Sequence, residues 1–178
     1  MRRNVVLIAV ATFALLCARA ADAKDMNGRV GVGAEKTLGG VEGLDVTYWV
    51  GKIAVDGAVS LGFLFPDQGD SGVSIAIAGG VLFQIIASDS AALLFGGRLN
   101  IGKAPSTDVQ FAIEAPLRLE WWAADHFSLH AEVGLAIDIV GDQGGNLVGA
   151  GGVSPIPGTA FVVGGTYLTG GAGFSVYF

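Results

Sequence analysis

Only one segment of the chain combines residue types that catalysis can use. His126 ends an expected turn, and Ser128 and His130 follow at alternate positions of the expected strand that begins at Phe127. Side chains two residues apart on one strand face lie roughly 7 Å apart, too far for a direct hydrogen bond between Ser128 and a histidine. The two histidines are separated by about 13 Å, so they do not ligate one metal ion. We therefore predict that the protein is not an enzyme and has no catalytic residues, metal site or cofactor.

A larger set of polar side chains shares the alternate face of the expected strands. Residues separated by two along a strand lie on one face. We expect this face to line the interior of a barrel, where Arg98 and Arg118 pair with carboxylates because isolated buried charges are costly. The predicted lumen network comprises Asp56, Arg98, Glu114, Arg118, Glu120, Glu132 and Asp138, and the same face carries Arg29, Glu35, Asp45, Gln84, Asn100 and His130.

Eight segments, in which apolar residues recur at every second position, are expected to position these side chains. Val, Ile, Leu and Phe alternate with small or charged residues, and this alternation predicts β-strands. The expected strands are 28–38, 44–50, 53–65, 73–87, 91–101, 109–122, 127–140 and one within 159–178. Pro116 falls inside the sixth, where we expect a β-bulge. Short connections at 51–52, 88–90 and 123–126 alternate with longer ones at 39–43, 66–72, 103–108 and 141–158.

The composition places these strands in a membrane. Hydrophobic residues make up 52% of the 178 residues, charged residues only 15%, and the mean hydropathy is +0.60. Beyond the first 23 residues, no apolar run approaches the roughly 20 residues that a membrane helix needs. Strands of about 9–11 residues are enough to cross a bilayer when tilted. We therefore predict an all-β fold, an eight-stranded antiparallel up-and-down transmembrane β-barrel.

The first 23 residues read as a cleaved signal peptide. A basic start, an apolar run over residues 5–16 and small residues up to Ala23 have the order of a secretory signal. The barrel domain is then 24–178, with 7 basic and 15 acidic residues and a net charge near −8. This charge argues against nucleic acid as a partner. The chain's one cysteine, Cys17, is lost with the signal peptide, so no disulfide is expected.

Aromatic residues gather at the two expected rims of the barrel. Outward rings of aromatic side chains at the interface levels are typical of membrane barrels. The predicted girdle comprises Tyr48, Trp121, Phe127 and Phe178 near the short turns, and Phe63, Phe65 and Phe111 near the longer loops.

The end of the chain carries the most specific resemblance. Gly173, Val176 and Phe178 fit the pattern Gly-x-x-apolar-x-aromatic of a barrel-assembly signal, with Val176 where an aromatic residue is common. With its eight strands, the chain resembles the small outer-membrane barrels of Gram-negative bacteria, the OmpA membrane domain and OmpX type. The resemblance implies a bacterial outer-membrane location, contact with outer-membrane lipid and lipopolysaccharide, and recognition by the barrel-assembly machinery.

The sequence leaves three functions open. We expect a monomer with a structural or surface-interaction role, because eight strands enclose an interior that side chains can fill. Abundant small lumen residues keep open the alternative of a narrow pore for small solutes or ions. A third alternative is a secreted, lipocalin-like binding barrel, whose apolar face would turn inward.

Deleting Phe178 should impair membrane assembly and leave export unaffected, because the closing strand loses its terminal aromatic residue. Cell fractionation and heat-modifiable migration on a gel measure the two steps separately. Normal insertion of the truncated protein would contradict the assembly role of the C-terminal residues.

Overall fold

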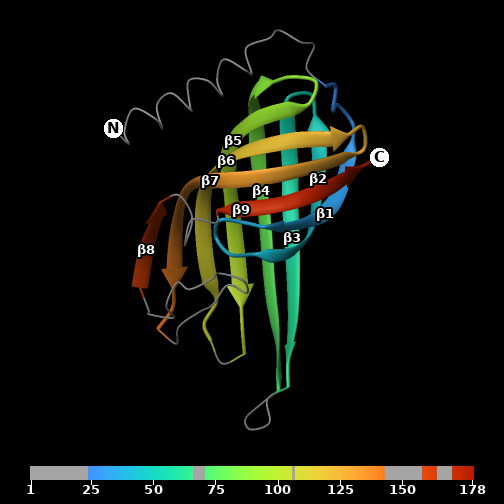
Figure 1. Cartoon of the computed structure of the whole chain (residues 1–178). Coiled ribbons are helices and arrows are strands. Elements are labelled where there is room, and N and C mark those ends of the chain that lie inside the picture. The colour runs from blue at the N-terminus through green and yellow to red at the C-terminus, as the bar shows by residue number, and fades with distance from the viewer. Residues whose placement is uncertain (1–23, 66–70, 106, 143–157, 164–169) are drawn as a thin grey trace, which may run out of the picture.

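The computed structural model describes residues 24–65, 71–105, 107–142, 158–163 and 170–178. Within these residues, nine β-strands form one antiparallel sheet that closes on itself (Figure 1). The strands are β1 (Val30–Lys36), β2 (Glu42–Val50), β3 (Ile53–Leu64), β4 (Gly72–Ala87), β5 (Ala91–Lys103), β6 (Gln110–Ala124), β7 (Phe127–Val140), β8 (Gly158–Val163) and β9 (Gly171–Tyr177).

The pairing of the first and last strands closes the barrel. β1 pairs with β2 on one side and β9 on the other, and β6 pairs with both β5 and β7. β8 and β9 share the eighth position, because β9 pairs with residues 127–132 of β7 and β8 pairs with residues 135–140. The predicted all-β fold, an eight-stranded closed antiparallel barrel, is confirmed, with its last strand in two pieces.

The strand faces differ sharply in chemistry. Large apolar side chains point outward and are exposed, as Phe63 (66%) and Val133 (53%) illustrate. The inner face is buried and carries charged residues such as Arg98 and Glu132. A chain folded in water normally places its charges outside and its largest apolar side chains inside. In this barrel, buried charges lie inside and large apolar side chains cover the outer face of every strand, although some apolar side chains, such as Trp49 and Trp122, also lie inside.

Pro116 does not cause a bulge, contrary to the sequence prediction. It pairs with Gly134 in regular register, and the β5–β6 register is the same before and after it. The β5–β6 pairing is interrupted only between Phe95↔Leu117 and Arg98↔Glu114. Proline lacks an N–H, so one ladder bond is lost here without an extra residue entering the strand. The register shifts lie instead between Gln84 and Ile86 and between Trp122 and Ala124.

The β1–β2 connection also differs from the prediction. β1 ends at Lys36 rather than Leu38, and residues 37–41 fold into the barrel interior, where they are buried. We call this segment the inward turn. The backbone N–H of Thr37 donates to the Val41 carbonyl (2.8 Å), and the Val41 N–H donates to Thr37 Oγ1 (2.9 Å). Gly40 has a φ of 94°, a left-handed conformation that glycine adopts without strain.

Some expectations fall on parts of the chain that are not described. The expected signal peptide, 1–23, and most of the expected loops 66–72 and 141–158 lie outside the described residues. Among the residues that are described, no helix has the length and apolar character needed to cross a membrane.

Two strand glycines allow a matched test of the close packing between strands. A Cβ on Gly96 would overlap the backbone of Val81 and Leu82 in β4, whereas a Cβ on Gly79 would meet nothing within 4 Å. We expect Gly96→Ala to lower the free energy of unfolding by about 1–3 kcal/mol, because the β4 backbone must move.

The matched change Gly79→Ala should leave the free energy of unfolding unchanged or raise it by about 0.4–1 kcal/mol, since it restricts only the unfolded chain. Urea unfolding of the folded protein in detergent measures both changes. Equal effects of the two substitutions would contradict the close approach at Gly96.

Candidate functional site: a buried arginine–carboxylate cluster

Two arginines and four carboxylates meet inside the barrel. Arg98 on β5 lies directly opposite Glu114 on β6, and Arg118 on β6 lies directly opposite Glu132 on β7. Directly opposed residues on one sheet face have Cβ atoms about 5 Å apart, so local pairing alone brings these charges together. Glu35 on β1 and Asp56 on β3 reach the arginines from other parts of the wall. We call Glu35, Asp56, Arg98, Glu114, Arg118 and Glu132 the arginine cluster.

Arg98 contacts all four carboxylates of the cluster. Its Nη2 donates to Asp56 Oδ2 (2.5 Å) and to Glu132 Oε1 (3.0 Å), and its Nη1 donates to Glu132 Oε2 (2.9 Å) and Glu114 Oε2 (3.1 Å). Nη2 also lies 3.6 Å from Glu35 Oε2. The two bonds to Glu132 form a bidentate pair, the strongest geometry that a guanidinium offers a carboxylate.

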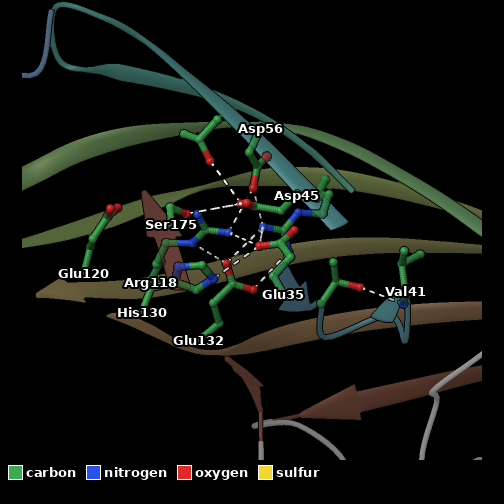
Figure 2. Close-up of polar contacts among 12 residues, drawn as sticks. Glu35, Val41, Asp45, Asp56, Arg118, Glu120, His130, Glu132 and Ser175 are labelled. Atoms are coloured by element: carbon green, nitrogen blue, oxygen red, sulfur yellow. Dashed lines mark hydrogen bonds and ion pairs between the residues drawn. The ribbon is translucent and has the colours of Figure 1, made fainter. Parts of the chain in front are cut away.

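Arg118 binds three of the same carboxylates (Figure 2). Its Nε donates to Glu132 Oε1 (2.5 Å), and its Nη2 donates to Glu35 Oε2 (2.7 Å) and Asp56 Oδ2 (2.9 Å). Glu132 and Asp56 therefore bridge the two arginines, and the cluster ties five strands together across the lumen.

The cluster carries more negative than positive charge. Four carboxylates surround two guanidinium groups, and the imidazole of His130 adds a partner for Glu35, with Nε2 3.4 Å from Oε2. Asp45 lies beside this group, where it accepts from Thr47 Oγ1 (3.3 Å) and from Ser175 Oγ (3.5 Å).

Three carboxylates of the cluster have oxygens close enough to hold a metal ion. Atoms of Glu35, Asp56 and Glu132 all lie within 4.8 Å of one another. Each of these groups already accepts hydrogen bonds from Arg118, however, and two of them also accept from Arg98. The guanidinium groups therefore occupy the position that a cation would take.

The cluster does not include every residue of the predicted network. Asp56, Arg98, Glu114, Arg118 and Glu132 lie in it, together with Glu35, which the network did not include.

Three other residues of the predicted inner face have different surroundings. Glu120 instead accepts from the hydroxyl of Tyr177 (2.6 Å), and the Oδ1 atom of Asp138 has no hydrogen-bond partner among the described residues. Arg29 lies at the rim, where Nη1 donates to the Asp125 carbonyl (3.2 Å).

A second cluster fills the lumen at the end with the short turns. It contains no charged residue, and its side chains are at most 5% exposed. The ring centroids of Trp49 and Trp122 are 6.4 Å apart, and Trp49 Nε1 donates to Tyr177 Oη (3.5 Å). We call this group the aromatic plug: Met26, Trp49, Ala54, Leu82, Ala92, Leu94, Trp122 and Tyr177. Alternation places both tryptophans on the inner face, but no motif in the sequence marks them as neighbours.

The aromatic residues of the predicted girdle lie on the outer surface. All are exposed except the half-buried Phe127, whose ring centroid is 6.2 Å from that of Phe174. Tyr48, Trp121, Phe127 and Phe178 lie near the short turns, and Phe63, Phe65 and Phe111 near the opposite strand ends.

The terminal residues complete the β1–β9 pair. Gly173 lies opposite Glu35, and Val176 lies opposite Val32 with its side chain outward. The N–H of Phe178 donates to the Val30 carbonyl (2.9 Å).

The two histidines have different surroundings. His126 Nδ1 lies 2.9 Å from the Tyr177 carbonyl at the rim, whereas His130 points into the lumen beside Glu35. Ser128, between them, is fully buried, and its hydroxyl has no hydrogen-bond partner among the described residues.

No protein-family model, curated protein or solved structure matches the chain.

Replacing Arg118 with leucine should strongly destabilise the barrel. The change leaves Glu35, Asp56 and Glu132 in the lumen with one guanidinium among them, and breaking one partner of a buried ion pair costs about 3–5 kcal/mol. Urea unfolding in detergent gives the free energy of unfolding. Arg29→Leu is the matched control at the exposed rim, where we expect a loss below about 1 kcal/mol. Equal losses for both variants would show that the cluster does not stabilise the fold.

Proposed function

We propose that the protein is an integral outer-membrane barrel with a closed lumen and a structural or surface-interaction role. The observation that carries this proposal is the outward placement of large apolar side chains on every strand of the barrel. Exposed apolar patches on soluble monomers rarely exceed a few hundred Å². A surface of this kind needs lipid, so membrane lipid and lipopolysaccharide are the proposed partners.

The strand lengths suit a bilayer. β3 to β7 contain 12 to 16 residues each, more than the roughly 9–11 that a tilted membrane strand needs. Closure of the sheet pairs the backbone of neighbouring strands, as the hydrocarbon core requires. The exposed aromatic residues near both strand ends match the interface levels of such a barrel. The C-terminal Gly173, Val176 and Phe178 are the proposed signal for the assembly machinery.

Three layers of side chains support a closed lumen. The aromatic plug fills the end with the short turns, the arginine cluster fills the middle, and the inward turn lies beyond it. The small lumen residues, which left room for a pore in the sequence analysis, contact Val41 of this turn. A filled interior favours a structural role over a permanent conduit.

The second candidate is a narrow pore that opens when these layers rearrange. It is favoured by the charge of the lumen, where seven buried carboxylates face two buried arginines: Glu35, Asp45, Asp56, Glu114, Glu120, Glu132 and Asp138 against Arg98 and Arg118. Such a pore would select cations. A secreted, lipocalin-like barrel gains no support, because its apolar residues would face inward.

Fractionation with detergent extraction tests the membrane proposal. We expect the protein in the outer-membrane fraction, released only by detergent, with heat-modifiable migration. Recovery in the soluble fraction without detergent would contradict it. Planar bilayers then separate the two candidates: the closed barrel should give no steady conductance, whereas cation-selective steps in the native protein would establish the pore.

A further inference from the structure

The inward turn crosses the lumen from one wall to the other. It leaves β1, and β1 lies four positions from β5 around the eight-stranded barrel. On that far side, Thr37 Oγ1 donates to Asn100 Oδ1 (2.9 Å), and the Gly39 N–H donates to Glu114 Oε1 (2.6 Å). These two are the hydrogen bonds between the turn and the opposite wall within the described chain.

Small side chains of the barrel wall, which we call the cup, pack around the turn. Val41 is fully buried and packs with four alanines, Ala58, Ala76, Ala78 and Ala112. A Cβ on Gly39 would lie 2.7 Å from Asn100 Nδ2 and 2.8 Å from the Ala112 Cβ, so the cup has no room for a side chain there. The turn therefore fills this part of the lumen with close packing on its alanine neighbours.

The wall of this space has hydrogen-bond acceptors that the turn does not use. Gln110 is 2% exposed and Asp138 is 5% exposed, yet Gln110 Oε1 and Asp138 Oδ1 have no hydrogen-bond partner among the described residues. Both lie beside Ala112 of the cup: Asp138 is directly opposite Ala112, and Gln110 precedes it by two residues on the same face. Unpaired buried acceptors are costly, and a donor carrying positive charge would satisfy them best.

We propose that the space under the inward turn is a binding site for a small cation with N–H donors, a primary ammonium or a guanidinium, and that the turn is its built-in competitor. The Gly39 N–H donates to Glu114 Oε1, as an N–H group of such a cation would. Asp138 supplies the negative charge and Gln110 a neutral acceptor, whereas Glu114 already accepts from Arg98 and Asn100 and offers only the bond that Gly39 now makes. The arginine cluster closes the site on its inner side, so the ligand enters from the loop side.

This proposal goes beyond the closed barrel and depends on the lumen alone. The membrane location is tested separately by fractionation, so the two can fail independently.

Expelling the turn tests the site. Gly39→Leu puts a side chain where the cup has no room. Ala76→Cys replaces one of the four cup alanines with a reporter thiol. The chain's one other cysteine is Cys17, in the segment expected to be cleaved. Folded protein in detergent is treated with 2-aminoethyl methanethiosulfonate and with its anionic sulfonatoethyl analogue. We expect Gly39→Leu to raise the labelling rate by the ammonium reagent about ten-fold or more, with the sulfonate reacting at least about ten-fold more slowly.

Matched variants assign the effect to the turn and to Asp138. Gly79→Leu, at a glycine with open space, should leave the labelling rate unchanged. Asp138→Asn in the Gly39→Leu background should reduce the preference for the ammonium reagent. Excess ethylammonium, but not ethanesulfonate, should slow labelling by occupying the site.

Two results would overturn the proposal. Equal labelling by both reagents would reject the cation class. A reporter thiol that stays unreactive in a folded Gly39→Leu barrel would show that the turn does not cover a site. If Gly39→Leu does not fold, Thr37→Val supplies the same test, because it keeps the side-chain size and removes the hydroxyl that contacts Asn100 and Val41.

Discussion

Glu132 receives hydrogen bonds from both buried arginines, and the interior of the barrel is arranged around this contact. Removing two guanidinium groups from water costs several kcal/mol each, and the cost is offset only where carboxylates surround them. Glu35, Asp56 and Glu114 complete that shell from three further positions on the wall. A register slip of one residue would turn Glu132 to the apolar outer face, so the cluster also makes wrong strand pairing costly.

The rest of the lumen is filled on either side of this cluster by different means. Towards the short turns, the indoles of Trp49 and Trp122 fill the space, and the Tyr177 hydroxyl donates to Oε1 of Glu120. Towards the loops, a segment of backbone fills the space instead. Small residues at Ala58, Ala76, Ala78 and Ala112 leave the space that Val41 of the inward turn occupies.

Alternation explains why much of the site could be predicted. The side-chain period of a strand is two, so sequence parity alone places Arg98, Arg118 and Glu132 on the inner face, and hairpin pairing brings Arg118 next to Glu132. Parity does not give height along the barrel axis. Glu120 and Asp138 share the inner face with the arginines but lie at other levels. Glu35 contacts Arg118 across 83 positions of sequence, a contact that only closure of the sheet creates.

Local periodicity is enough to predict eight alternating segments and the face on which each strand residue lies. Closure through the β1–β9 pair, and the division of the last segment into β8 and β9, depend on contacts between distant parts of the chain. Tertiary structure decided which carboxylates bind which arginine, since shear between strands sets the relative heights of side chains. It also decided the path of residues 37–41. These residues read as the end of a strand and a glycine-rich turn, and nothing local separates a turn in solvent from one that folds inward. The hydrogen bonds of Thr37 to Asn100 and of Gly39 to Glu114 across the lumen stabilise the inward path.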